Sequence, residues 1–113
     1  CDLHLAARSA ADLEAVRAQI TAEQRVSVFC HAVDLSVASN AVALARDCRD
    51  VDFLVNNAGS IPQGTLDTVD DETWRRAWDL KVFGFIDITR GIYARMRERG
   101  SGVIVNVIGA AGE

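Results

Sequence analysis

Residues 51–59 read Val-Asp-Phe-Leu-Val-Asn-Asn-Ala-Gly, and this stretch decides the fold of the chain. Val51–Val55 is a short, almost wholly apolar run with β-branched residues, which is typical of a strand covered on both faces in a parallel sheet. Two amides and a glycine then end the run. The carboxyl end of such a strand faces the crevice in which doubly wound α/β sheets bind ligands, so polar residues there indicate a binding site.

Upstream of this stretch, strand-like and helix-like segments alternate. We expect strands over Leu3–Ala7 and Val26–Ala32. Between them, Ser9 fits the N-cap of a helix with apolar residues at helical spacing (Leu13, Val16 and Ile20). The segment after the second strand predicts another helix, capped by Ser36 or Ser39 and ending near Asp50. Its apolar stripe consists of Val37, Ala41, Leu44, Ala45 and Cys48.

Downstream, one long helical stretch precedes the last strand. The pattern predicts a helix that begins at Thr68 or Asp70 and continues to residue 99, with a broad buried face. That face comprises Trp74, Trp78, Val82, Phe85, Ile86, Thr89, Tyr93 and Met96. Gly84 and Gly91 interrupt the pattern and indicate a bend or close packing of another backbone. Gly100–Gly102 ends the helix, and Val103–Ile108 is expected to be a further buried strand.

The resulting order, β-α-β-α-β-α-β, predicts a parallel, doubly wound α/β sheet of the Rossmann type. With 113 residues, half of them hydrophobic and a quarter charged, residues 1–113 are expected to form part of a single domain. A net charge of −4 and a pI near 5.1 argue against nucleic acid and anionic membranes as partners. No apolar run approaches the roughly 20 residues of a membrane span and no leader opens the chain, so we expect a cytoplasmic protein.

The cysteines and histidines do not indicate a metal site. Cys1, Cys30 and Cys48 form no Cys-x-x-Cys pair and have no histidine at ligand spacing, so we expect buried free thiols and no bound metal. His4 and His31 both lie within expected strands, where a packed or edge histidine is the plainer interpretation.

Two motifs carry a resemblance to a known family. Asn56-Asn57-Ala58-Gly59 resembles the Asn-Asn-Ala-Gly motif of the short-chain dehydrogenase/reductase family, and residues 106–112 resemble its Asn-Ile-Ser-Ser-x-x-Gly stretch. The resemblance implies that the chain holds the second to fifth strands of a sheet ordered 3-2-1-4-5. The first strand, with its Gly-rich turn, would then precede Cys1 and lie between Leu3–Ala7 and Val51–Val55, which would stand about 10 Å apart. The family's Tyr-x-x-x-Lys motif would follow Glu113.

The ends of the second and third family strands bear on the cofactor. A dinucleotide fold commonly has an acidic residue at the end of the second strand, but here Ala7 is followed by Arg8, which favours NADP over NAD because a guanidinium suits phosphate oxygens. The resemblance further implies that Asp34 and Leu35 contact the adenine.

The organising stretch itself supplies the remaining cofactor residues. The resemblance implies that Asn57, Ala58 and Gly59 line the adenosine side of the crevice. The glycine would permit a close approach of the backbone to the ligand.

The chain departs from the family at two catalytic positions. Lys81 stands where asparagine is usual, and Gly109 stands at the position of the catalytic serine. We expect the Lys81 amine to point toward Asn56 and Gly109 and to act as a catalytic cation. It would bind the nicotinamide ribose and lower the pKa of a tyrosine beyond Glu113. The plainer alternative is a lysine whose stem packs on the helix and whose amine reaches solvent.

The sequence therefore predicts an oxidoreductase that transfers a hydride between NADP(H), or alternatively NAD(H), and a small-molecule alcohol or carbonyl. A non-catalytic dinucleotide-binding relative is the first alternative, and an unrelated flavodoxin-like binding domain is the second. Aromatic residues on the long helix, together with the resemblance, predict a homo-oligomer that pairs through residues 70–99.

Overall fold

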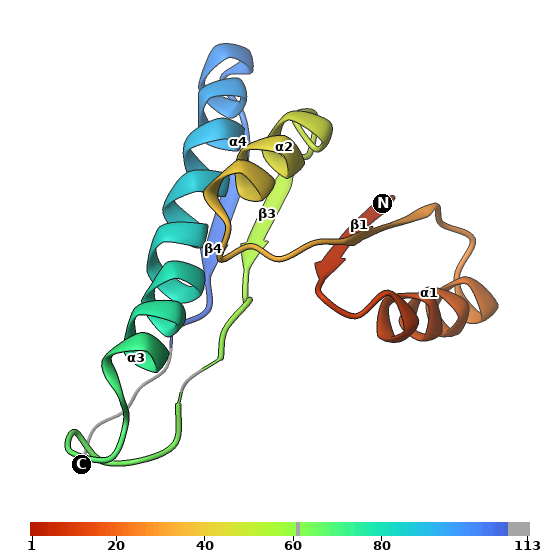
Figure 1. Cartoon of the computed structure of the whole chain (residues 1–113). Helices are drawn as coiled ribbons and strands as arrows, with labels where there is room; N and C mark the ends of the chain where they lie inside the picture. The colour runs from red at the N-terminus through yellow and green to blue at the C-terminus, as the bar shows by residue number, and fades with distance from the viewer. Residues whose placement is uncertain (61, 109–113) are drawn as a thin grey trace. The chain divides into compact units, whose positions relative to one another are not determined.

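The computed structural model describes residues 1–60 and 62–108 and shows strands and helices in alternation, with the strands paired in parallel (Figure 1). The α/β class expected from the sequence is thus confirmed. The chain divides into two compact units, Cys1–Leu35 and Ser36–Glu113. That both belong to a single domain stays a prediction.

The first unit is a parallel strand pair with a helical connection. It contains β1 (Leu3–Ala7), α1 (Ala10–Glu23) and β2 (Val28–Ala32), and the pairing runs from Leu3 opposite Val28 to Ala7 opposite Ala32. The Ser9 side chain caps α1 by accepting a hydrogen bond from the Asp12 N–H at 3.2 Å, as predicted. The second strand begins at Val28 and not at Val26, because the Val26 N–H donates to the Gln24 carbonyl and closes a turn.

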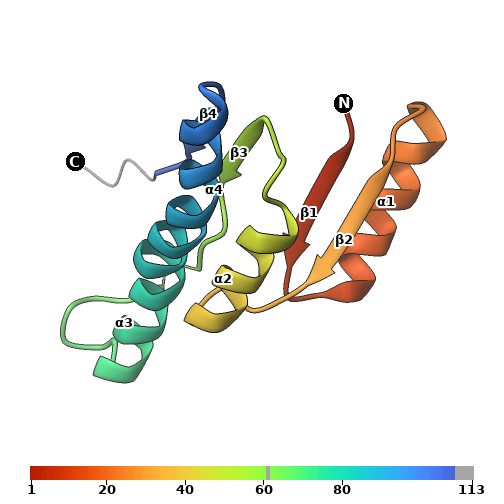
Figure 2. The ribbon, with the colours of Figure 1, turned by 90° about the horizontal axis from the view of Figure 1, so that it is seen from above.

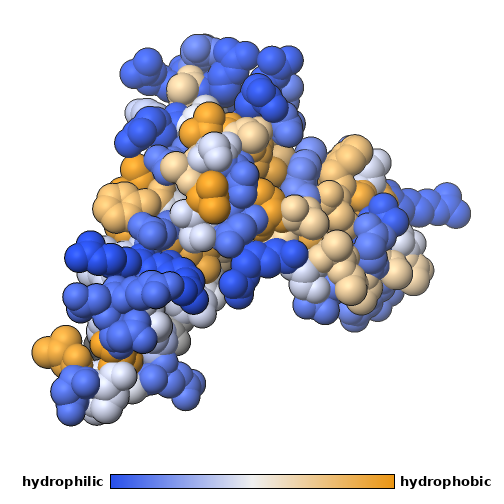
Figure 3. Space-filling model, in the orientation of Figure 1, coloured by the Kyte–Doolittle hydropathy of each residue, from blue (hydrophilic) through white to orange (hydrophobic). Residues whose placement is uncertain are grey.

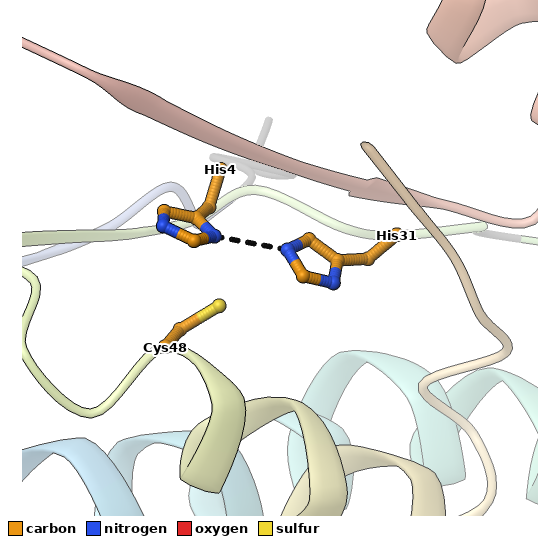
Figure 4. A group of neighbouring side chains, drawn as sticks. All are labelled: His4, His31 and Cys48. Atoms are coloured by element: carbon orange, nitrogen blue, oxygen red, sulfur yellow. Dashed lines mark hydrogen bonds between the residues drawn. The ribbon is translucent and has the colours of Figure 1, made fainter. Parts of the chain in front are cut away.

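The two faces of β1–β2 differ in chemistry. On one face Val28 is buried, and the Cys30 thiol donates to the Leu13 carbonyl of α1 at 3.5 Å. On the other face the His4 and His31 rings share a hydrogen bond of 2.9 Å between Nδ1 and Nε2 (Figure 4). The ring of His4 also stacks on Phe29, with 4.8 Å between the ring centroids. The histidines therefore pack against each other across the strand pair.

The second unit contains the other strand pair and most of the helices. Its elements are α2 (Ala38–Asp47), β3 (Phe53–Asn56), α3 (Asp71–Trp78), the π-helix η1 (Asp79–Gly84), α4 (Phe85–Arg99) and β4 (Val103–Asn106). β3 and β4 pair in parallel, from Phe53 opposite Val103 to Asn56 opposite Asn106. The helices α2 and α4 lie side by side (Figures 1 and 2). In the 3-2-1-4-5 order the second and third strands are neighbours, and so are the fourth and fifth. The pairing of β1 with β2 and that of β3 with β4 are the two pairings that this order requires. The distance predicted between β1 and β3, with the first family strand lying between them, stays a prediction.

Several local signals act as the sequence predicted. Asp70 caps α3 by accepting a hydrogen bond from the Thr73 N–H at 2.7 Å. Gly100 ends α4 in the left-handed region, with a φ of 73° that favours glycine. Gly91 allows the close packing inferred for it, because a Cβ there would lie 2.7 Å from the Cβ of Ala45 on α2.

Within the described residues, the strands of the second unit are covered on one face only. Leu54 and Asn56 are buried, but Phe53 and Val55 are 66% and 60% exposed. Alternate side chains of a strand point to opposite faces, and the described elements of this unit cover only one of them. β4 is exposed on the same side. β3 begins two residues later and ends one residue later than expected, and β4 ends at Asn106, two residues earlier than expected.

Two helix predictions also need correction. Val37 is the N-cap residue of α2 with no side-chain cap, so neither Ser36 nor Ser39 caps it, and α2 ends at Asp47. Of the apolar stripe predicted for this helix, Ala41, Leu44, Ala45 and Cys48 are buried, but Val37 is 46% exposed. Burial raises the pKa of the Cys48 thiol, and the Asp47 carboxylate raises it further. Not all the cysteines are buried, because Cys1 is exposed and Cys30 is half-buried.

The buried face predicted for the long helix is correct only in part. Met96 is buried as predicted, but Ile88 and Ile92, which were not on the predicted face, are buried as well, and Trp78 and Tyr93 are 55% and 53% exposed. The π-helical bonds of η1 add a residue to one turn, which rotates the side chains that follow relative to a regular α-helix. On the face drawn in Figure 3, hydrophobic residues lie among hydrophilic ones. Within the described residues, no helix has the length and apolar character needed to span a bilayer.

Candidate functional site

The candidate site of the second unit lies where β3 and β4 end. We call residues 56–59 and 106–108 the carboxyl edge. Since β3 and β4 are parallel and Asn56 pairs with Asn106, both strands present their last polar residue at the same level.

The Asn56 side chain links the elements that meet at this edge by hydrogen bonds. Its side chain is buried, with 5% of its surface exposed, and its Nδ2 donates to Thr89 Oγ1 at 2.9 Å and to Asn106 Oδ1 at 2.8 Å. Its carbonyl accepts a hydrogen bond from the Val107 N–H at 2.8 Å. A buried amide with both side-chain N–H groups used is a structural tie between β3, β4 and α4, and it fixes where the following residues lie.

The residues just after Asn56 are open. Asn57 and Gly59 are exposed and Ala58 is half-buried. Small side chains at 58 and 59 leave the backbone accessible, which is what a ligand that approaches the main chain requires. This part of the edge therefore fits a dinucleotide.

Lys81 reaches this edge from η1. Its Nζ donates to the Val107 carbonyl at 2.7 Å and lies 4.9 Å from the centre of the Phe85 ring. Its stem also passes over Gly59, since a Cβ at that residue would lie 3.2 Å from Lys81 Cδ and 3.3 Å from Nζ. The amine thus lies at the carboxyl ends of the strands, the direction expected from the sequence. Gly109, toward which it was also expected to point, lies outside the described residues.

The local helix geometry explains how Lys81 attains this position. Lys81 lies within the π-helical segment, and π-helical turns inside α-helices frequently occur at functional sites. Gly84, at the end of that segment, is buried and leaves no side chain at the point where regular α-helix resumes. Lys81, the cation identified from the sequence, therefore lies in an irregular helical turn.

The first unit holds the other predicted cofactor residues. Arg8 directly follows β1 and is exposed, and among the described residues it takes part in no ion pair. Asp34 and Leu35 follow β2 and are half-buried. The Val33 N–H donates to the Ala7 carbonyl at 2.8 Å, so the two strand ends remain tied just before these residues. An exposed guanidinium at this point fits a phosphate-bearing ligand.

Sequence reasoning missed the contribution of Thr89. Its spacing placed it on the apolar face of the long helix, whereas its hydroxyl accepts from Asn56. The sequence did contain a signal for this contact: Thr89 is a hydroxyl residue among apolar ones on the helix, and the apolar run before that helix is followed by two asparagines that need hydrogen-bond partners.

Comparison with known proteins places this geometry in a family. The family model described as short chain dehydrogenase matches residues 1–113. A 2-keto-3-deoxy-L-fuconate dehydrogenase of Xanthomonas campestris pv. campestris is 28% identical over 102 residues, which cover 90% of this chain and 34% of that protein. A 7alpha-hydroxysteroid dehydrogenase of Escherichia coli is 32% identical over 99 residues, covering 88% of this chain and 34% of that protein. The chain thus spans about a third of the length of these curated relatives.

Solved structures agree with this assignment. L-Sorbose reductase from Gluconobacter frateurii, complexed with NADPH and L-sorbose, matches with a TM-score of 0.84 and 30% identity over 93% of this chain and 41% of that one. A short-chain dehydrogenase from Sphingobium yanoikuyae in complex with NADPH matches with a TM-score of 0.86 and 28% identity over 93% of this chain and 42% of that one. The chain belongs to the short-chain dehydrogenase family, and its fold is part of that family's Rossmann-type domain.

Proposed function

We propose that the full-length protein is an oxidoreductase that transfers a hydride between NADP(H) and the alcohol/carbonyl pair of a small molecule. The observation that carries this proposal is the carboxyl edge, where an open, small-residue backbone lies beside the Lys81 amine. Membership of a family of dehydrogenases supports it, as do the structural neighbours bound to NADPH.

The choice of NADP(H) over NAD(H) rests on Arg8. An exposed guanidinium that no described carboxylate neutralises is suited to a 2′-phosphate, which it can bind through two parallel hydrogen bonds. Asp34 and Leu35 would hold the adenine, and residues 57–59 would line the adenosine side. The bound nicotinamide would supply the carbon that carries the hydride.

Lys81 is the residue to which we assign the catalytic charge. Its amine lies beside the open backbone, whereas Gly109, at the family's serine position, has no side chain that could bind a substrate oxygen. A positive charge held in place stabilises negative charge that develops on a nearby oxygen.

A second candidate is a dinucleotide-binding protein without catalytic activity. The loss of a serine hydroxyl at Gly109 favours it, because that hydroxyl would otherwise contact the reacting oxygen. Such a protein would bind NADPH and transfer no hydride.

Purified full-length protein separates these candidates. We expect the absorbance of NADPH to fall when a panel of aldehydes, ketones and keto acids is added, and the absorbance of NADH to fall more slowly. Binding of NADPH, followed by its fluorescence, without turnover on any panel member would favour the non-catalytic candidate. Absence of NADPH binding would contradict both.

We further propose that the protein is a homo-oligomer that pairs through the long helix 70–99. Trp78 and Phe83 are each more than half exposed and, with Trp74, line a shallow groove on this helix. Burying such aromatic side chains against a second copy removes apolar surface from water. Sedimentation of the full-length protein at micromolar concentration should give a dimer or larger species, and a monomer would contradict this proposal. The cytoplasmic location stays a prediction.

A further inference from the structure

Lys81 differs from most cations of the chain in its surroundings. It is the only lysine among the 113 residues. Seven arginines lie within 4 Å of a carboxylate: Arg17, Arg46, Arg49, Arg76, Arg90, Arg95 and Arg99. Within residues 1–60 and 62–108, Lys81 has no carboxylate partner. Its positive charge is therefore not neutralised by any described side chain.

The partners that Lys81 does have are neutral and directional. The Val107 carbonyl accepts one of its three N–H groups, and the Phe85 ring lies beside the ammonium. Neither removes the net charge, and two N–H groups remain to be satisfied. Lys81 is half-buried as a residue but its hydrogen bond to Val107 is exposed, so the ammonium is accessible to an anionic ligand and can form a charge-assisted hydrogen bond with it.

The neighbouring backbone keeps the amine in this place. Gly59 provides the room for the lysine stem, because a Cβ there would lie within 3.3 Å of both Cδ and Nζ. The Val107 carbonyl that holds the amine is itself positioned by the hydrogen bond from the Val107 N–H to Asn56. The cation is thus directed at the same edge as the open residues Asn57 and Gly59.

We propose that the Lys81 ammonium binds an oxyanion at the carboxyl edge, a carboxylate or phosphate oxygen brought there by a ligand. This proposal rests on the proposed function, which assigns the ligands to this edge. The oxyanion belongs to an acidic substrate or to a phosphate of the dinucleotide, and the two sources call for different probes.

The test compares full-length wild type with Lys81→Met, Lys81→Arg and the control Arg25→Met. Arg25 is exposed just before the amino end of β2 and belongs neither to the carboxyl edge nor to the proposed cofactor residues, so its replacement removes the same charge without changing either. One arm measures the dissociation constants of NADPH and NADH by fluorescence. The other measures oxalate binding by calorimetry with and without NADPH.

We expect Lys81→Met to weaken binding in one arm by about tenfold or more, the usual loss for a charge-assisted contact. Lys81→Arg should stay within about threefold of wild type, because it restores the charge, and Arg25→Met should leave both arms unchanged. A loss confined to oxalate identifies a substrate carboxylate. An equal loss for NADPH and NADH identifies a phosphate that the two cofactors share.

Dissociation constants that Lys81→Met leaves within about twofold in both arms would overturn the proposal. So would equal losses in Arg25→Met. If Lys81→Met does not fold, Lys81→Gln provides the same test by removing the charge while keeping a polar side chain, and unchanged binding in that variant would also overturn the proposal. Oxalate binding needs no turnover, so the oxyanion site can be confirmed even if no hydride transfer is found.

Discussion

The two units use the same plan, two parallel strands joined through helix, but they build the connection differently. In the first unit a single regular helix, α1, runs from its Ser9 cap to Glu23 and returns the chain to β2. In the second unit the connection is α3, η1 and α4, and the π-helical turn in its middle carries Lys81 to the ends of β3 and β4. The regular helix α1 only joins β1 to β2, whereas the irregular connection also brings the Lys81 side chain to the ends of β3 and β4.

This difference suggests a division of labour within the proposed function. The first unit presents Arg8, an exposed cation at the end of β1, and this residue would select the cofactor. The second unit buries Asn56 to fix its strand ends and then presents Lys81, which would act at the reacting ligand. Substitutions in the two units should therefore change different measured quantities.

The largest effect is expected at Lys81. In the full-length enzyme, Lys81→Met should lower turnover by about a hundredfold or more, because it removes the only cation that the described residues hold at the carboxyl edge. The midpoint of thermal unfolding should change little, since one exposed hydrogen bond to Val107 is lost. Steady-state kinetics with saturating NADPH measures this effect. Turnover near that of wild type would leave Lys81 as a surface cation.

A smaller effect is expected where α4 meets α2. Gly91→Ala places a methyl group 2.7 Å from the Ala45 Cβ, and such overpacking costs about 1 to 3 kcal/mol, less the helix propensity gained by alanine. Urea denaturation of the full-length protein measures the loss of stability. Adding Ala45→Gly should recover part of it by removing the opposing methyl. In the Ala45→Gly background, Gly91→Ala should therefore cost less than it does in the wild type, and an unchanged cost there would show that the contact is not the cause.

The smallest effects compare the helix caps of the two units. Ser9→Ala should lower the free energy of unfolding by about 1 kcal/mol at every pH at which the protein is folded, since a hydroxyl does not titrate there. Asp70→Ala should show a pH dependence, because the hydrogen bond from the Thr73 N–H lowers the pKa of the Asp70 carboxyl.

The sign of that dependence follows from the lowered pKa. Stabilisation by Asp70 is complete above the ordinary pKa of an aspartate and is lost as the pH falls through the lower value of the folded state. Thermal unfolding should therefore separate wild type from Asp70→Ala at neutral pH and bring them together in acid. A difference that stays constant into acid would contradict the capping role of the charged carboxylate.

How far the sequence predicted this structure depended on how local each signal was. Ser9, Asp70 and Gly100 act within one turn of helix; Ser9 and Gly100 were identified correctly, and Asp70 was one of the two residues proposed for the start of its helix. Gly91 was identified as a site of close packing, but its partner Ala45 is remote in the chain and could not be named. The Asn-Asn-Ala-Gly motif located the site. The hydrogen bonds of Asn56 to Thr89 and Asn106 could not be predicted, because they link three separate elements and follow no regular spacing in the sequence.

The failures share a physical cause, which is that periodicity assumes regular geometry and uniform cover. The face predicted for the long helix included Tyr93 because the pattern was continued through η1 as if it were α-helix. Phe53 and Val55 are apolar and lie on the strand face that no described element of their unit covers.

The central claim is that the first unit selects NADP while the second unit acts on the ligand that reacts. The ratio of the NADH to the NADPH dissociation constant in the full-length protein, compared among wild type, Arg8→Ala and Lys81→Met, tests it most directly. Loss of a charge-assisted contact should cost Arg8→Ala about 1 to 3 kcal/mol of NADPH binding and hardly affect NADH, so its ratio should fall toward one. Lys81→Met should keep the wild-type ratio. A wild type without preference for NADPH, or a ratio that falls as far in Lys81→Met as in Arg8→Ala, would contradict the account.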